Sequence, residues 1–316
     1  MLLRLVASRC AFAALTLFAV SLLIFVGTQL LPGDVAQAIL GQSAAPETVA
    51  AIRRELNLDR PAHERYLEWI FSCLRGDLGR SLASGAPITD MIAGRLNNTL
   101  VLALTSALVA MPLSIALGLY AALRREQVAD HAISAITLIF VSVPEFLIAY
   151  LLMMALAVKF AWLPALSMLN DGASFWAWVR ALALPVLTLT LVTLAHTMRL
   201  TRTAIVSVLS TDYIRMAELK GISPARIILR HALPNAMSPI LSILMLTLAY
   251  LVVGVVVVET VFSYSGMGKL MVDAVTARDI PLVQACGLIF TTVYVVCNFL
   301  ADLLGLLVNP RLRHPK

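Results

Sequence analysis

Six long apolar segments restrict the fold of this chain more than any other feature of its sequence. A helix needs about 20 mostly apolar residues to cross the hydrocarbon core of a bilayer. Charged residues make up only 13% of the chain, whereas a soluble domain averages about 25%. The sequence therefore predicts an all-α, polytopic membrane protein with six transmembrane helices. The segments that would form them lie within residues 10–31, 96–123, 132–158, 181–198, 232–258 and 280–301.

The first apolar segment is predicted to be an uncleaved membrane helix. Arg4 and Arg9 precede it, and Ala36-Gln37-Ala38 faintly resembles a signal cleavage site. However, residues 10–33 are all uncharged, and this run is longer than the roughly 7–15 residues of a signal-peptide core. Its length therefore favours a helix that remains in the protein.

The placement of basic residues indicates how the segments are oriented, because lysine and arginine collect in short cytoplasmic loops. If the N-terminus is cytoplasmic, the inside pieces carry 13 basic residues and the two short outside loops carry four. The sequence therefore predicts that both termini are cytoplasmic. The net charge of +6 is explained by this placement, and no nucleic-acid partner is expected.

The long loop over residues 32–97 is predicted to form a small helical cap on the outer face. Apolar residues recur at helical spacing within 49–56 and 66–74, and residues 59–61 break the pattern between them. The predicted organisation is residues 1–31 for the N-terminus and first helix, 32–97 for the outer helical loop, 98–310 for a core with five transmembrane helices, and 311–316 for a cytoplasmic tail.

A basic segment over residues 207–236 follows the fourth apolar segment and runs into the start of the fifth. We call it the coupling segment. Asp212 is a plausible N-cap for a short helix, and Gly221 stands where a left-handed residue ends such a helix. Ser223-Pro224 is typical of the start of a second helix, which Pro234-Asn235 would end. The pattern predicts a rigid unit of helix, glycine elbow and helix.

Two small residues of the coupling segment suggest that it docks against another protein. Ala217 and Gly221 are four residues apart, so they share a helix face, and small side chains let another surface approach closely. A cytoplasmic loop that only sets orientation needs charge alone. The caps, the elbow and the small face therefore favour docking over a merely solvated loop.

Complete catalytic motifs are missing from the sequence. The run 266–270 lacks the spacing and the hydroxyl of a phosphate-binding loop. His63-Glu64 lacks the second histidine of a zinc site, because Leu67 stands there. Ser263 has no histidine in the apolar segments around it to act as its base, and a turn is expected at 263–266. We expect no enzyme activity, no metal site and no cofactor site in this chain.

Ionisable residues at membrane depth are candidates for a functional role, since placing one at the centre of a membrane helix costs about 2.5–3.5 kcal/mol on insertion scales. Glu145 follows Pro144 inside the third segment and is the best candidate. Glu259 and Asp302 lie near segment ends, where water is expected to reach them, so interfacial and functional roles are weighed equally. We name Glu145 and Glu259 as possible path or gate residues. His196, near the end of the fourth segment, is expected to face the interface.

Several motifs together give the chain a family resemblance. Ala217, Gly221 and Leu233-Pro234 have the spacing of the cytoplasmic EAA signature of bacterial ABC-importer permeases. In its order of motifs the chain resembles the dipeptide/oligopeptide/nickel importer family, in the branch of the first permease. The other motifs are Leu31-Pro32-Gly33-Asp34, Gly76-Asp77-Leu78-Gly79-Arg80-Ser81, Asn98-Thr99-Leu100, Ser142-Val143-Pro144-Glu145-Phe146, Glu259-Thr260-Val261-Phe262 with Gly266-Met267-Gly268, and Arg278-Asp279-Ile280-Pro281.

A few positions depart from that pattern. Arg215-Met216 stands where the signature has Glu and Ala, and His231 stands where it has Ile. Ser265 replaces a usual proline, and Asn309 replaces a usual aspartate. The motifs span the whole chain in the family's order, so these changes do not alter the resemblance.

The resemblance implies a type I ABC-importer permease in the bacterial inner membrane, forming half of a path for di- or oligopeptides. It implies as partners a homologous second permease, two cytoplasmic ATP-binding subunits and an outer substrate-binding protein, with ATP bound by the ATPase subunits. The expected ATPase-docking residues are Tyr213, Arg215, Ala217, Glu218, Gly221, Arg226, His231, Leu233, Pro234 and Asn235.

Two alternatives remain open at the level of sequence. A proton-coupled secondary transporter would use Glu145 as its working residue. An ABC importer of the same kind could carry another solute, such as a nickel chelate or a glycoside.

Overall fold

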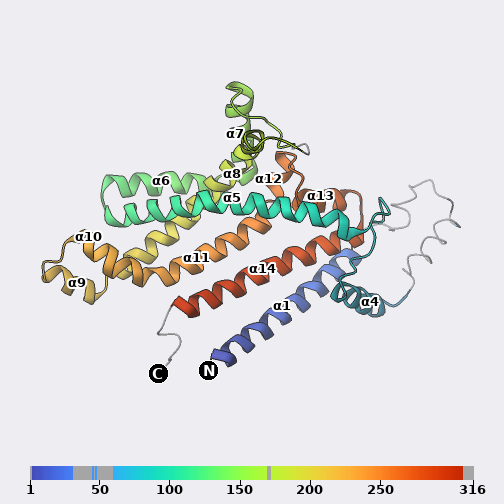
Figure 1. Cartoon of the computed structure of the whole chain (residues 1–316), viewed down its shortest axis with the longest axis horizontal. Coiled ribbons are helices and arrows are strands. Elements are labelled where there is room, and N and C mark those ends of the chain that lie inside the picture. Colours follow the sequence, from blue (N-terminus) through green and yellow to red (C-terminus); the bar gives the residue numbers. More distant parts are fainter. Residues whose placement is uncertain (1, 31–44, 46, 48–59, 169–171, 309–316) are drawn as a thin grey trace.

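The structure is a computed structural model that describes residues 2–30, 45, 47, 60–168 and 172–308. Helices make up most of these residues (Figure 1). The β pairing found in the described part is one isolated bridge between Arg80 and Pro87. The prediction of an all-α fold is confirmed.

Five of the six apolar segments form long helices, and each is long and apolar enough to cross a membrane. The longest has 36 residues and is about 54 Å long at 1.5 Å per residue. The fifth continues almost directly into the short α12 (Val256–Val261). The bounds are Leu2–Gln29 for α1, Ile88–Leu123 for α5, Phe175–Leu209 for α8, Leu233–Gly254 for α11 and Ile280–Val308 for α14.

The third apolar segment differs from the uninterrupted helix that its hydropathy suggested. It forms α6 (Val128–Ser142), then α7 (Glu145–Leu152) with the π-helical turn η1 (Met153–Lys159), and the chain bends by 102° between the two arms. The cause is Pro144, because a proline disfavours helical backbone at the residue before it, and Val143 is extended. The bent pair makes a sixth span if both arms are counted as one.

Small residues bring α5 and α8 close together along the bundle. In the described chain these two helices share the most extensive contact of any pair. A Cβ atom added to Gly118 of α5 would lie 3.0 Å from the carbonyl oxygen of Met198 on α8. Small residues permit this close approach of helix backbones in membranes. The α5–α8 pair is therefore the most closely associated pair of helices in the described bundle.

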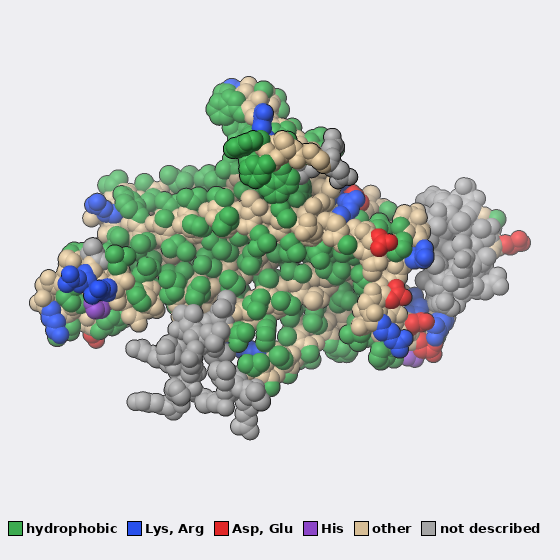
Figure 2. All heavy atoms as spheres, viewed as in Figure 1, with side chains coloured by type: hydrophobic (Ala, Val, Ile, Leu, Met, Phe, Trp, Pro, Cys, Tyr) green, Lys and Arg blue, Asp and Glu red, His purple; other side chains and the backbone are tan. Residues whose placement is uncertain are grey.

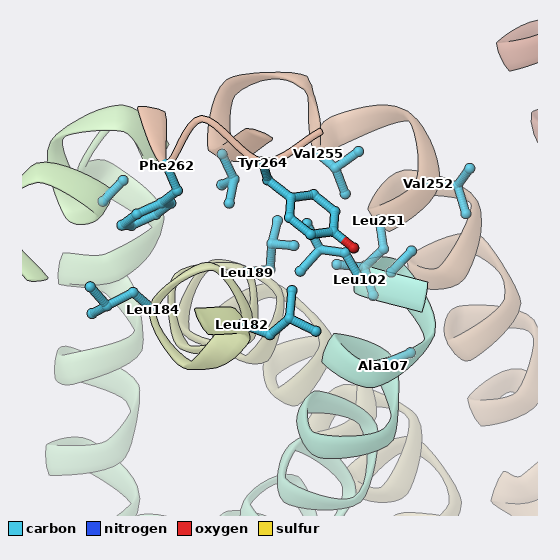
Figure 3. Close-up of a cluster of buried hydrophobic side chains, with 13 residues drawn as sticks. Leu102, Ala107, Leu182, Leu184, Leu189, Leu251, Val252, Val255, Phe262 and Tyr264 are labelled. Carbon is cyan, nitrogen blue, oxygen red and sulfur yellow. The ribbon is translucent and has the colours of Figure 1, made fainter. Parts of the chain in front are cut away.

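The largest buried apolar cluster lies where α5, α8 and α11–α12 meet. Figure 3 shows side chains from these helices gathered around one space, with Leu102 from α5, Leu189 from α8, and Leu251 and Phe262 from the fifth span. These four side chains are 0–1% exposed. Truncating such a residue to alanine typically costs about 2–5 kcal/mol.

The two ends of the bundle differ in composition. Figure 1 shows α9, α10 and the α5–α6 turn at one end, and α4 and α13 at the other. Figure 2 shows hydrophobic side chains over the middle of the visible face and charged side chains at both ends. A bilayer would cover the apolar middle.

The outer loop contains the short helix α4 (Ala62–Leu74), which confirms the helix expected over residues 66–74. The other predicted repeat, over residues 49–56, lies outside the described residues. Tyr66 fixes α4 to α1, because its hydroxyl lies 2.8 Å from Ser21 Oγ and its ring meets Phe25 edge-on at 5.4 Å.

Candidate functional site

The first short helix of the coupling segment is α9 (Asp212–Leu219). Its N-cap is Thr211 rather than Asp212, so the predicted cap was one residue late. Thr211 has extended backbone at φ −83° and ψ 150°, whereas Asp212 is already helical. The Asp212 carboxylate therefore lies in the first turn, where the helix dipole favours negative charge.

The glycine elbow is present as predicted. Gly221 has φ +73°, in the left-handed region that residues with a side chain rarely adopt. Its N–H donates to the Glu218 carbonyl at 2.9 Å, and the N–H of Ile222 donates to the Ala217 carbonyl at 3.2 Å. Ser223-Pro224 then starts α10 (Pro224–Arg226), with the proline in the first turn. The elbow is therefore closed by backbone hydrogen bonds.

The second helix does not end at Pro234-Asn235, contrary to the prediction. α10 passes through the π-helical turn η2 (Ile227–Ala232) into α11, and residues 227–261 form one apolar helical stretch. Pro234 lies in the first turn of α11, where its missing N–H is tolerated. The coupling segment is thus continuous with the fifth span.

A buried cluster holds the coupling segment together from inside. Ile214, Ala217, Ile227 and Ala232 are 0–7% exposed and pack against one another. Ala217 therefore faces the interior, not an outside partner as its small size suggested. Its role in this chain is to let α9 lie close to η2.

A hydrogen-bonded contact joins the same two elements at the surface. The carbonyl oxygen of His231 accepts the amide of Asn235 at 2.7 Å and the hydroxyl of Tyr213 at 3.3 Å. The Tyr213 bond connects α9 to η2, and the Asn235 bond connects η2 to the start of α11. A force applied to α9 would reach the fifth span through them.

The outer surface of the coupling segment combines positive charge with exposed apolar side chains. The large residues Met216, Leu219 and Leu229 are 54%, 77% and 63% exposed. The sequence analysis did not identify these three residues as docking candidates. Large apolar residues within an otherwise polar run could have indicated them. Of the predicted docking residues, Tyr213, Arg215, Glu218, Gly221, Arg226, Pro234 and Asn235 are exposed, His231 and Leu233 are half-buried, and Ala217 is buried.

Glu145 lies at the corner of the bent third span. It is the first residue of α7, directly after Pro144. Its Oε1 atom is buried, and no hydrogen-bond partner reaches it within the described part of the chain. Glu145 is therefore a half-buried ionisable group at the bend, without a hydrogen bond among the described residues.

Glu259 is fully buried, so the expectation that water reaches it was wrong. Its carboxylate accepts the Thr99 hydroxyl at 2.6 Å and the N–H of Lys269 at 3.0 Å. The Thr99 oxygen in turn accepts the N–H of Met267 at 2.8 Å. Glu259 therefore caps the start of α13 (Met267–Thr276) and joins it to α5.

Two further expectations concern the ends of the spans. Asp302 pairs with Arg9 at 2.7 Å, and both side chains are partly exposed. His196 is exposed near the middle of α8, and its interfacial position remains a prediction. A turn with a left-handed Ser263 occupies residues 263–266, as predicted.

A contact at the outer end was not identified from the sequence. Asp279 is 1% exposed; it accepts the Ser81 hydroxyl, the N–H of Leu82 at 3.1 Å and that of Ala83 at 3.3 Å. Two motifs used for the resemblance, at residues 76–81 and 278–281, thus come together in space. The contact fixes the outer loop to the start of α14.

The cysteine outside the spans has a suppressed reactivity. Burial and, to a lesser degree, the nearby Asp77 carboxylate raise the pKa of the Cys73 thiol to about 11. Because the thiolate is the reactive form, this group is a poor nucleophile at neutral pH. Cys10, Cys73, Cys286 and Cys297 are free thiols in the structure, and among the described residues no three His, Cys, Asp or Glu side chains group as metal ligands.

Comparisons with known proteins agree on a single family. Residues 114–314 match the family described as binding-protein-dependent transport system inner membrane component, and residues 2–103 match its N-terminal counterpart. The chain is 36% identical over 295 residues to a probable peptide ABC transporter permease protein of Sinorhizobium fredii, covering 93% of this chain and 94% of the relative. It is 37% identical over 299 residues to a glutathione transport system permease protein of Escherichia coli, covering 95% of each.

A solved structure gives the same answer for the fold. The chain is similar to one in the inward-facing MetNI methionine ABC transporter, with a TM-score of 0.53 and 18% sequence identity. The match covers 69% of this chain and 96% of the other. It shows that the described helices have the fold of an importer's transmembrane subunit.

Proposed function

The chain belongs to the family of binding-protein-dependent transport system inner membrane components, and we propose that it forms half of a path for peptides across the bacterial inner membrane. It is a multi-pass permease subunit of an ABC importer. A subunit of this kind is not itself an enzyme. The family assignment replaces the alternative of a proton-coupled secondary transporter.

The names of two relatives support peptides as the solute. One is named for peptides and the other for glutathione, which is itself a tripeptide. Each matches this chain over more than nine-tenths of its length. Peptides are therefore proposed ahead of the other solutes considered, nickel chelates and glycosides.

The family's partners are ATPase subunits and a substrate-binding protein. We assign to this chain one homologous second permease, two cytoplasmic ATP-binding subunits and an outer binding protein. ATP would be bound by the ATPase subunits. Both termini and the coupling segment would be cytoplasmic, as the distribution of basic residues indicates.

One observation carries the proposed mechanism. The Gly221 elbow holds an exposed surface of Met216, Leu219 and Leu229, and both ends of the coupling segment run directly into membrane spans. An ATPase subunit would bind this surface, with Arg215 and Arg226 pairing with its acidic groups. Nucleotide-driven movement would then be passed to α8 and α11.

The path itself is assigned to the corner at Glu145. The Glu145 carboxyl group has a buried oxygen without a hydrogen-bond partner in the described residues, and such a group at membrane depth is functional by default. Glu259, the other candidate, is fully used in holding α13. We therefore give Glu145 the path or gate role and Glu259 a supporting one.

The docking proposal is tested with Gly221→Pro and Ala217→Trp. Proline cannot adopt the positive φ of the elbow, and tryptophan cannot fit into the buried cluster around residue 217. Both variants should insert normally and lose import. Lys220→Gln is the control, because it removes a charge beside the elbow and keeps its shape. Normal ATP-coupled uptake in proteoliposomes by either elbow variant would contradict the proposal.

A further inference from the structure

An ion pair near the coupling segment has no role in the function described so far. Asp130 lies in the first turn of α6, and Arg202 lies on α8. Arg202 Nε donates to Asp130 Oδ1 at 2.7 Å, and Arg202 Nη2 donates to Asp130 Oδ2 at 2.6 Å. The Asp130 side chain is only 5% exposed and that of Arg202 27%. Two parallel bonds of this kind fix orientation as well as distance.

The same carboxylate also holds the turn between α5 and α6. Asp130 Oδ2 accepts the N–H of Glu126 at 3.1 Å. Glu126 has φ +65°, a left-handed conformation that is unusual for a residue with a side chain. Asp130 thus stabilises the tight turn and at the same time attaches it to α8. The ion pair is integrated into the backbone of the turn.

Arg202 lies on the helix that enters the coupling segment. Leu209, the end of α8, lies seven positions after Arg202, which is about 10 Å along the helix. Leu209 packs against the buried cluster of the coupling segment. The N–H of Thr211 donates to the Val208 carbonyl at 3.1 Å, so the link to α9 is short. Movement of α9 would therefore displace Arg202.

Asp130 lies on the helix that leads to the bend. α6 has 15 residues and is about 22 Å long. It ends at Ser142, directly before the corner where Glu145 starts α7. Asp130 and Arg202 are 72 positions apart in the sequence, so their contact is a tertiary one. Among the described residues, it is the one ion pair that joins α6 to α8.

We propose that the Asp130–Arg202 ion pair stays closed during transport and makes α6, and with it the corner at Glu145, follow the coupling segment. Asp130 and Arg202 are positioning residues in this mechanism, since neither touches the solute. The inference rests on the proposed docking of the coupling segment. Without the pair, the ATPase subunits would still bind and hydrolyse ATP, but movement of the coupling segment would no longer be passed fully to the bend between α6 and α7.

The test measures solute imported per ATP hydrolysed in proteoliposomes holding the complete importer. Asp130→Asn and Arg202→Gln should each lower this ratio about fivefold or more, while complex assembly and ATP hydrolysis persist. Arg202→Lys keeps the charge without the two-pronged geometry and should fall between them and the wild type. The double variant should be no worse than either single one, because both changes remove one interaction.

Arg199→Gln is the matched control, since it removes a positive charge from an exposed site three residues earlier on the same helix. An unchanged ratio in Asp130→Asn and Arg202→Gln would overturn the inference, and so would failure of all the variants, Arg202→Lys included, to assemble. The Gly221→Pro variant separates the two proposals. If it loses import while the ion-pair variants couple normally, docking stands and the role of the ion pair is wrong.

Discussion

Glu259 shows how a single carboxylate is accommodated inside an apolar bundle. Burying an ionisable group without hydrogen bonds is costly, but Glu259 accepts bonds from a side chain and from the backbone of α13. Gly266 and Gly268 leave the space that the carboxylate fills, because a Cβ atom on either would contact it. Residues 266 and 268 therefore lack side chains where the Glu259 carboxylate needs the space.

Gly266→Ala should destabilise the protein by about 1–3 kcal/mol, the usual cost of forcing extra atoms into a packed core. The backbone at Gly266 is extended, at φ −101° and ψ −176°, so the expected loss comes from overlap with Glu259 and not from backbone strain. The shift of the unfolding midpoint in detergent measures the effect.

Gly94→Ala is the control for that substitution. An added Cβ at this helical position meets nothing within 4 Å, and alanine favours a helix by up to about 1 kcal/mol over glycine. The control should therefore be neutral or stabilising. Equal stability of the Gly266→Ala variant and the wild type would show that Glu259 does not occupy the site described.

At the scale of elements, the bend between α6 and α7 depends on one proline. Val143 is extended at φ −89° and ψ 128°. The Pro144 carbonyl then accepts the N–H groups of Leu147 at 3.0 Å and Ile148 at 3.2 Å to begin the new helix. Apolar residues lie on both sides of this break. Without Pro144, we would expect one continuous helix here.

Pro144→Ala should let α6 continue toward α7 and reduce import. Spin labels at Ala132→Cys and Val158→Cys, both at exposed positions, would report the change. A straight helix separates these residues by about 39 Å, and the bent arrangement brings them closer. We expect the distance to increase in the variant.

Pro112→Ala provides the comparison, because Pro112 lies inside the continuous helix α5. It should leave the distance between the two labels unchanged. An unaltered distance in the Pro144→Ala variant would mean that packing of α7 against α8 and α12, and not the proline, sets the bend.

At the scale of the whole molecule, the apolar middle and the charged ends define one axis (Figure 2). The coupling segment and the α5–α6 turn lie at one end, and α4 and α13 lie at the other (Figure 1). A bilayer perpendicular to this axis would place the two ends in different compartments. Because basic residues are in excess at the first end, we propose that this end is cytoplasmic.

This orientation predicts the outcome of cysteine labelling in intact cells with a reagent that does not cross the membrane. With the native cysteines replaced by serine, Lys269→Cys on α13 should react from outside. Lys220→Cys in the coupling segment should react only after the membrane is opened. The reverse pattern would contradict the assigned orientation, whereas the fold itself would be unaffected.

Much of this architecture was predictable from local sequence properties. The positions of the long helices follow from runs of apolar residues, and the elbow follows from Gly221 placed between two short helical patterns. The inward position of Ala217 was not predictable, because its spacing from Gly221 fits either face of α9. The continuation of the helix past Pro234 was also missed, since a proline is a usual sign of a helix end, whereas Pro234 lies in the first turn of α11, directly after η2.

By itself the sequence determined the membrane-spanning helices, the coupling segment and its elbow, since hydropathy and backbone preferences act between near neighbours. Only the tertiary structure decided which distant polar groups meet. Asp130 and Arg202 are 72 positions apart, Thr99 and Glu259 are 160 apart, and Ser81 and Asp279 are 198 apart. These pairs depend on the helix faces that close packing brings together, and most buried polar groups in proteins have partners of this kind.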